Sequence, residues 1–188
     1  MTGADLETPP VPLRWVLYDV DFATGAIRWE RTLHTARPSS KHEKNSYASE
    51  TPVTDGERVY AYLGYVGLFA FDLDGTQLWH TPMDARETRE GWGSASSPVV
   101  HGNRLFLVND NLEQSFVAAY DTATGTEIWR VNREEASNWS TPFVWEHELR
   151  TEIVTTGTGG VRSYNLDGEL LWELTGMSSI HVATPFTQ

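Results

Sequence analysis

The sequence predicts an all-β protein of about four repeated units, and three observations carry the prediction. Four tryptophans each follow a glycine by four residues and recur at intervals of 43 to 50 positions. The pairs are Gly25 with Trp29, Gly75 with Trp79, Gly125 with Trp129 and Gly168 with Trp172. A second series keeps the same order between them, namely the Ser/Thr-Pro pairs that begin at Thr51, Ser97, Thr141 and Thr184. Between these landmarks lie short alternating strands and glycine turns, with no long helical apolar period.

Strand-rich repeats of this length are typical of β-propeller blades, and by period alone they also suit kelch or WD-type blades. Each unit is expected to be an antiparallel meander of three or four strands. In chain order we expect a disordered or linker segment at 1–12, a partial blade at 13–35, blades at about 46–83, 92–133 and 137–174, and the start of another blade at 180–188.

The turn motif distinguishes among the propeller types. Residues 119–129 match the pattern A-x-D-x-x-T-G-x-E-x-W at every defined position, and Asp21, Thr24, Gly25 and Trp29 follow it closely. Asp and Thr side chains hydrogen-bond their own turns, and glycine accepts a positive φ there. The repeat therefore resembles the tryptophan-docking repeat of PQQ-like, quinoprotein-type propellers, and the resemblance implies that these tryptophans and glycines dock neighbouring blades.

Propellers of this type usually have seven or eight blades, so the resemblance implies a partial ring and a fragment of a longer protein. Two other arrangements stay open. Two copies of the chain complete an eight-bladed ring as a homodimer, or residues 13–32 pair with 180–187 to close a small ring of four blades.

Composition excludes several classes of protein. The chain has 188 residues, 39% of them hydrophobic, and eight tryptophans, as expected of a folded domain. Its net charge of −12 would repel phosphate backbones, so nucleic acid is not an expected partner. There is no cysteine, which excludes disulfides and thiolate sites. No stretch is long and apolar enough for a membrane helix, and the first residues lack the pattern of a signal peptide.

Candidate binding residues lie in the segments that lead into each blade, where an aromatic or imidazole ring comes together with small hydroxyl residues. In a propeller these segments reach the axis, and such groups suit a polar pocket with aromatic walls. The alternative is that inner strands need small residues because they crowd the axis. The candidates are Lys44, Asn45, Tyr47, Glu50, Trp92, Ser96, Asn138, Trp139 and His181.

No catalytic residue and no metal site is predicted. The six histidines show no metal-ligand spacing, and no G-x-S-x-G nucleophile motif is present. The oxygens around Asp110 are a conceivable calcium site, but Asn/Asp-rich reversals are ordinarily turns, and we favour a turn.

Stretches such as KNSYASETP at residues 44–52 and SNWSTPF at residues 137–143 look like those of bacterial PQQ-like repeat proteins, of which the BamB type is the familiar member. That resemblance implies a non-catalytic scaffold, periplasmic or secreted, that needs no cofactor and binds a protein or small polar ligand. The alternative is a fragment of a PQQ- and calcium-dependent alcohol or sugar dehydrogenase. Quinoproteins of that kind commonly carry a vicinal disulfide, which a chain without cysteine lacks.

Overall fold

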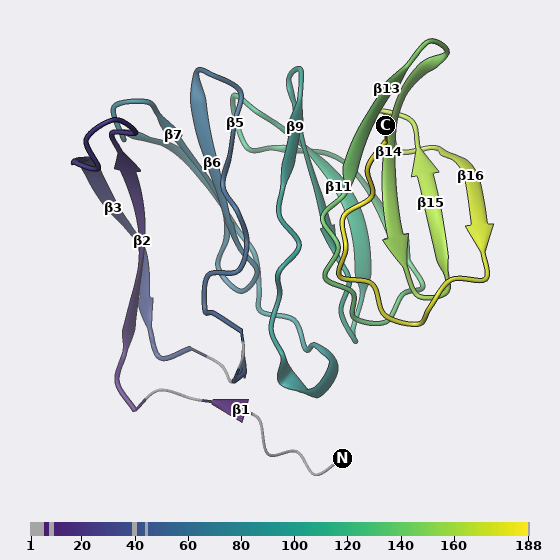
Figure 1. Cartoon of the computed structure of the whole chain (residues 1–188), viewed down its shortest axis with the longest axis horizontal. Coiled ribbons are helices and arrows are strands. Elements are labelled where there is room, and N and C mark those ends of the chain that lie inside the picture. Colours follow the sequence, from purple (N-terminus) through teal and green to yellow (C-terminus); the bar gives the residue numbers. More distant parts are fainter. Residues whose placement is uncertain (1–5, 8–9, 39–40, 44, 188) are drawn as a thin grey trace.

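The structure, a computed structural model, describes residues 6–7, 10–38, 41–43 and 45–187. Its sheets stand side by side in an arc, from β2–β3 at one end to β13–β16 at the other (Figure 1). Within the described part, the only helical element is the single 3₁₀ turn η1 (Arg89–Gly91). The predicted all-β class and partial propeller are confirmed.

Each blade is an antiparallel meander in chain order. Blade 1 holds two strands, β2 (Leu13–Val20) and β3 (Ile27–Ala36). Blade 2 holds β5 (Val53–Thr54), β6 (Arg58–Leu63), β7 (Gly67–Asp72) and β8 (Gln77–Pro82). Blade 3 holds β9 (Val99–His101), β10 (Arg104–Asn109), β11 (Ser115–Asp121) and β12 (Glu127–Arg133). Blade 4 holds β13 (Phe143–His147), β14 (Arg150–Gly157), β15 (Gly160–Tyr164) and β16 (Leu170–Thr175).

Alternation along the middle strands builds a core on both faces of a blade. In β7, Leu68 and Ala70 pack in one cluster with Leu105 of blade 3. Their neighbours Phe69 and Phe71 pack with Trp15 of blade 1. Because successive side chains of a strand point to opposite faces, one apolar run such as β7 joins two blade interfaces. The first strands meet along the inner side of the arc, where β9 contacts both β5 and β13.

Three tryptophans of the outer strands reach across to the next blade. Their indole nitrogens donate to main-chain oxygens there: Trp29 to Leu73 (2.9 Å), Trp79 to Thr122 (3.0 Å) and Trp129 to Leu166 (2.8 Å). The rings lie on the turn glycines of that next blade, Gly75, Gly125 and Gly168. All three glycines have positive φ. A Cβ on any of them would come within 2.8 Å of an indole carbon.

The fourth tryptophan and the first glycine do not make this contact. The Trp172 indole donates to Glu152 Oε2 of its own blade (2.7 Å). Gly25 is exposed, and no atom lies within 4 Å of the place a Cβ would take. The two ends of the arc therefore differ from the three internal junctions.

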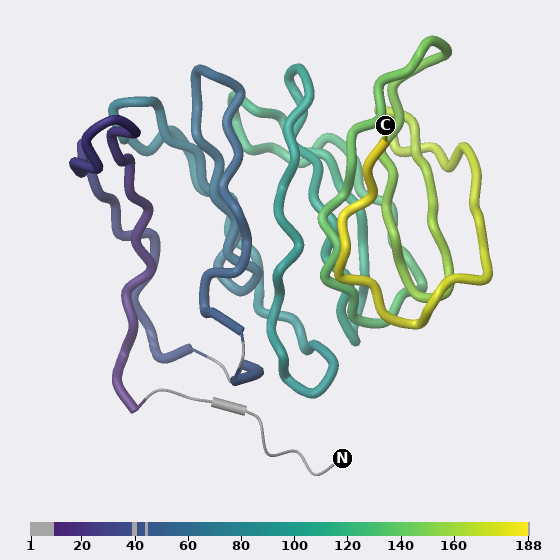
Figure 2. The backbone as a smooth tube through the Cα atoms, in the orientation of Figure 1, coloured from purple at the N-terminus to yellow at the C-terminus, as the bar shows by residue number. Residues whose placement is uncertain are grey.

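Two predicted details differ from the structure. Leu6–Glu7, in the segment predicted to be a linker, form the short strand β1, which pairs with β4 (Lys41–His42). Residues 180–187, predicted to start a blade, contain no strand, because they have no second strand to pair with among the described residues. They run beside the segment before β13 instead (Figure 2). There Trp139 N donates to His181 O (2.9 Å).

The small four-bladed ring does not form, because among the described residues β2 and β3 pair only with each other. The described residues include no helix with the length and apolar character needed to cross a membrane.

Candidate functional site

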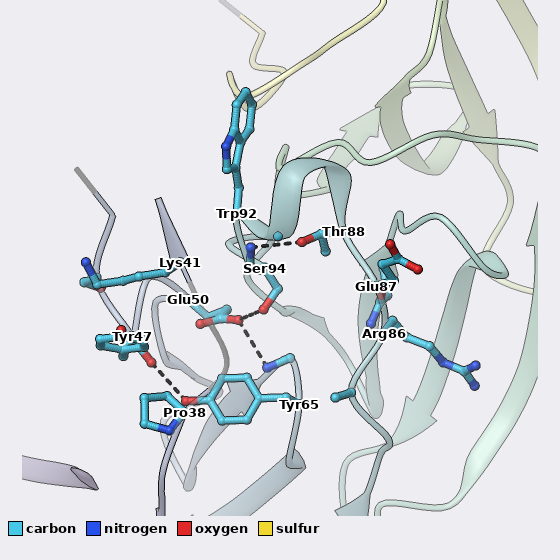
Figure 3. A pocket seen from close by; sticks show the side chains of 16 residues that line it. Pro38, Lys41, Tyr47, Glu50, Tyr65, Arg86, Glu87, Thr88, Trp92 and Ser94 are labelled. Atoms are coloured by element: carbon cyan, nitrogen blue, oxygen red, sulfur yellow. Dashed lines mark hydrogen bonds between the residues drawn. The ribbon is translucent and has the colours of Figure 1, made fainter. Parts of the chain in front are cut away.

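A pocket of about 310 Å³ lies between blades 2 and 3, beside the inner segments that precede them (Figure 3). Its walls come from the segment before β5, from the β6–β7 turn and from the loop around η1. The side chains that give the pocket its chemistry are Lys41, Tyr47, Glu50, Tyr65, Trp92 and Ser94.

Glu50 supplies a carboxylate held in place by two donors. Its Oε1 accepts hydrogen bonds from Ser94 Oγ (2.5 Å) and from the main-chain N–H of Gly64 (3.2 Å), both visible in Figure 3. Burial raises the pKa of Glu50, and the hydrogen bond from Ser94 only partly offsets this effect. A carboxylate that is already held in place in a largely apolar pocket can bind a hydrogen-bond donor or a cation in a fixed orientation.

The loop that carries Trp92 has an unusual backbone. Glu90 has a φ of 52° and a ψ of 19°, left-handed values that few residues other than glycine adopt. Gly91 and Gly93 on either side of Trp92 also have positive φ. Thr88 Oγ1 accepts from Gly93 N (2.9 Å) and ties the loop closed. Such strain concentrates at functional sites, where the surroundings enforce it.

Trp92 belongs to an aromatic group beside the pocket. Its ring lies 5.6 Å from that of Trp139, and the Trp139 indole donates to Gly93 O (2.7 Å). The His42 ring meets Trp92 edge-on at 5.5 Å. The Asn45 amide donates to Trp92 O (3.2 Å), so Asn45 fixes the loop. These contacts hold the ring in one position before any ligand binds.

The opposite wall is built around Tyr47. Its main-chain oxygen accepts from the hydroxyl of Tyr65 (3.2 Å) and from the indole of Trp15 (2.5 Å). The Lys41 ammonium lies 5.0 Å from the centre of the Tyr47 ring, a cation–π geometry. The pocket thus combines a positive and a negative group on rigid aromatic walls.

A second polar group lies away from the pocket, between blades 3 and 4. Asn138 Oδ1 accepts from His181 N (2.9 Å), and its amide donates to Asp110 Oδ2 (3.4 Å). Ser96 Oγ and His181 Nδ1 are buried, and no described residue gives either atom a hydrogen-bond partner.

Buried charges complete this second group. Arg133 Nη2 lies 3.6 Å from Asp110 Oδ2 and 3.4 Å from Glu135 Oε1, and Arg162 pairs with Glu135. Burial raises the pKa of Asp110 to about 6, although the Arg133 guanidinium acts in the opposite direction. Within the described part of the chain, no three His, Asp or Glu side chains are grouped so that they could hold a metal ion.

The structure brings some of the predicted site residues together and separates others. Tyr47, Glu50 and Trp92 line the pocket, while Trp139 and Asn45 hold the Trp92 loop. The remaining predicted residues that are described lie outside the pocket lining: Ser96, Asn138 and His181. Lys44 lies outside the described residues. The role of all nine as ligand contacts stays a prediction.

Sequence reasoning did not select Lys41, Tyr65 or Ser94 as site residues. Ser94 and Lys41 lie in the same segments before the blades as the predicted residues Trp92 and Asn45. Their closeness in sequence to those residues is the feature that could have indicated them. Tyr65 lies in the β6–β7 turn of blade 2, and its contacts with the Trp15 ring of blade 1 and with Tyr47 O bring it to the site.

Residues 64–187 match the family model described as outer membrane protein assembly factor BamB. No curated protein sequence matches the chain.

Among solved structures, BamB from Moraxella catarrhalis is similar with a TM-score of 0.62 and 18% identity, over 90% of this chain and 48% of BamB. A europium-containing methanol dehydrogenase has a TM-score of 0.64 and 14% identity, over 89% and 40% of the two chains. A quinohemoprotein alcohol dehydrogenase from Pseudomonas putida HK5 has a TM-score of 0.60 and 18% identity, over 87% and 32%. The chain therefore spans about half the length of BamB and less of the two dehydrogenases.

Proposed function

This chain belongs to the BamB family of PQQ-like propellers, and from that premise we propose that it is a non-catalytic binding module. The pocket between blades 2 and 3 receives a segment of a protein partner or a small polar ligand. The observation that carries the proposal is the carboxylate of Glu50, fixed by Ser94 and Gly64 inside a rigid aromatic pocket.

The geometry supports recognition because the pocket is built before a ligand arrives. Trp92 is held by a tilted ring contact with Trp139 and by the hydrogen bond from Asn45. A site that needs little ordering loses less entropy on binding, so a small contact area yields useful affinity. The Tyr and Trp side chains of the walls supply apolar contact area, while the Glu50 carboxylate fixes the orientation of a bound ligand by a hydrogen bond.

The second candidate is a quinoprotein dehydrogenase, which the similarity to the two dehydrogenase structures favours. Their names describe what those proteins do, and at 14–18% identity the likeness extends to the fold. A calcium-dependent quinone site needs several oxygen ligands around one metal. Among the described residues, no three His, Asp or Glu side chains are grouped so that they could supply such a set.

The binding proposal is tested by selecting peptides from a phage-displayed random library on the immobilised protein. Selected peptides should lose affinity at least about tenfold on Glu50→Gln and on Trp92→Ala, because each change removes one anchor of the pocket. Isothermal titration calorimetry with the synthesised peptides measures the effect.

The matched control is Glu57→Gln, which removes a carboxylate that is 80% exposed. Peptides should bind this variant as they bind the unmodified protein. A library that yields no binder, or binders that ignore both pocket substitutions, contradicts the proposal.

The dehydrogenase candidate has its own test. PQQ and calcium are added to the purified protein, which is then followed for a bound quinone spectrum and for dye-linked oxidation of alcohols. We expect neither signal, and turnover that requires both additions would overturn the scaffold proposal.

We also assign the parent protein to the periplasm or the cell exterior, because the family model is that of an outer membrane assembly factor. Cell fractionation with an antibody against the chain checks this assignment. Recovery with the cytoplasmic fraction contradicts it.

A further inference from the structure

The carboxylate of Glu50 has no cationic partner in the described part of the chain. Burial raises its pKa, no Lys or Arg is among the groups that lower it, and it forms no salt bridge with a described residue. By contrast, Asp110 Oδ2 lies 3.6 Å from Arg133 Nη2, and Glu152 Oε1 lies 2.6 Å from Arg150 Nε. Buried charges are normally paired, because withdrawing a charge from water without a partner is costly. The described residues therefore leave the negative charge of Glu50 available to a ligand.

The hydrogen bonds to Glu50 fix one of its oxygens and spare the other. Ser94 Oγ and Gly64 N both donate to Oε1. No described side chain donates to Oε2. A Cβ at residue 64 would overlap Ser94 Oγ and come within 3.2 Å of Oε1, so glycine at this position lets both donors reach the carboxylate. The carboxylate is thus held in place with one oxygen still able to accept a strong hydrogen bond.

The two basic side chains of the pocket wall act on other groups. The Lys41 ammonium donates to two main-chain oxygens of its own loop, each at 3.4 Å, and lies against the Tyr47 ring. The Arg86 guanidinium pairs with Glu113 at 2.9 Å. Lys41 also shows that an ammonium group and its alkyl stem fit against an aromatic wall of this pocket.

The rings beside Glu50 suit the stem of a cationic side chain. Figure 3 shows the carboxylate among Tyr47, Tyr65 and Ser94. Burial and, after it, the charge of Glu50 raise the pKa of the Tyr65 hydroxyl, so that charge acts across the pocket. The same hydroxyl donates to Tyr47 O (3.2 Å), which fixes the Tyr65 ring as a wall. Aromatic walls exclude water and strengthen the attraction between a carboxylate and a cation.

We propose that the pocket binds the ammonium group of a lysine side chain carried by a protein partner, with Glu50 as its counter-ion. The inference rests on the proposed function of the pocket and names the group that the pocket recognises. A volume of about 310 Å³ is at the lower end for ligand sites, which suits a single side chain. The net charge of −12 attracts a basic partner.

The hydrogen bonds of the carboxylate favour an ammonium over a guanidinium. A guanidinium pairs best with both oxygens of a carboxylate at once, through two parallel N–H groups. Oε1 of Glu50 already accepts from Ser94 and Gly64, so it is poorly placed for that arrangement. An ammonium is a compact charge that needs only one oxygen.

NMR titration of the isotope-labelled protein with three small probes tests the proposal. The probes are the N-acetyl methylamides of lysine, arginine and norleucine, and norleucine has the alkyl stem of lysine without the ammonium. The Gly64 amide, which donates to Glu50, and the Trp92 indole report binding. The lysine probe should bind at least about tenfold more tightly than the norleucine probe, and more tightly than the arginine probe.

Glu50→Gln should abolish the preference for lysine over norleucine, because the amide keeps the size of the side chain and removes its charge. The matched control is Glu57→Gln, which removes an exposed carboxylate outside the pocket and should keep the preference. Circular dichroism melting verifies that both variants are folded. The comparison of the three probes on the unmodified protein needs no variant.

Several results would overturn the proposal. They are equal binding of the lysine and norleucine probes, tighter binding of the arginine probe, a lysine preference that survives Glu50→Gln, and no shift of either signal with about 20 mM lysine probe. The phage-selected peptides keep this outcome separate from the binding function. Peptides that lose affinity on Trp92→Ala, but not when their lysines are replaced by norleucine, would support the pocket as a binding site and contradict its specificity for lysine.

Discussion

The indole of Trp129 lies so close to Gly168 that a Cβ on that glycine would come within 2.8 Å of two ring carbons. The same indole donates to Leu166 O at 2.8 Å. Packing and a hydrogen bond thus act together at the junction of blades 3 and 4. Removal of the ring leaves a cavity and one donor fewer at Leu166 O, which still accepts from the Arg104 guanidinium.

Trp129 is half-buried, so Trp129→Ala should lower the free energy of unfolding by about 3 kcal/mol, the lower end of the range for loss of a large aromatic ring. Urea denaturation followed by far-UV circular dichroism measures the change. Trp145→Ala is the control, since Trp145 contacts the His147 ring of its own strand and joins no two blades. Equal losses in the two variants would mean that the junction adds no stability.

Gly125→Ala should cost more stability than Gly102→Ala. Both glycines have positive φ, so both alanines carry a backbone strain of about 1 kcal/mol. At Gly125 the new Cβ also overlaps the Trp79 ring at 2.5 Å, whereas at Gly102 it meets nothing within 4 Å. Overpacking adds about 1–3 kcal/mol. Thermal melts of the two variants give the comparison, and similar melting temperatures would contradict the overlap.

Asp110 should make stability fall as the pH rises from about 4 to 6. Burial raises its pKa from 3.8 in the unfolded chain to about 6, so the folded state binds the extra proton in that window. Relative to Asp110→Asn, which does not titrate, the unmodified protein should lose up to about 3 kcal/mol across the window. Urea denaturation of both proteins at several pH values measures the difference, and a constant difference would refute it.

Glu152 should have the opposite dependence. Burial opposes its ionisation, but hydrogen bonds from Ser163, Arg150 and Trp172 outweigh this and lower its pKa from 4.5 to about 2. The stability it contributes is complete above 4.5 and is lost as the pH falls through 2. Glu152→Gln should therefore be destabilised by up to about 3 kcal/mol at pH 7 and much less near pH 2. Chemical denaturation of the variant and the unmodified protein at the two pH values measures this destabilisation. A destabilisation that is the same at both pH values would show that it does not come from the lowered pKa of Glu152.

Most of the fold could be predicted because the landmarks are local. An Asp or Asn, a glycine and a tryptophan in fixed register specify one turn and one outer strand, whatever the rest of the chain does. Residues 180–187 are the opposite case, because they were expected to start a blade and form no strand in the structure. Their pattern matches that of a first strand, but a strand forms only when a second strand pairs with it. The sequence of the segment alone does not show whether such a strand is present.

The candidate site was only partly predictable. Tyr47, Glu50 and Trp92 were selected because their segments lead into blades, and this places them near one another. Tyr65 joins them through the packing of two blades. Asp110 lies in a reversal correctly interpreted as a turn, where Asn111 Oδ1 accepts from Gln114 N (2.7 Å). Its buried contact with Arg133 is long-range, and no spacing rule anticipates it.

The strand order has a consequence for how the chain acquires its structure. Within each blade the strands pair in chain order, so each hairpin can form as soon as its two strands exist. Loops that must close are short, which lowers the entropic barrier to folding. The first complete meander can therefore form while later blades are still being synthesised, and each new one is added against a surface already in place. During synthesis the protein would fold one sheet at a time. The tryptophan of each folded sheet would then bind the glycine turn of the next sheet as that turn leaves the ribosome.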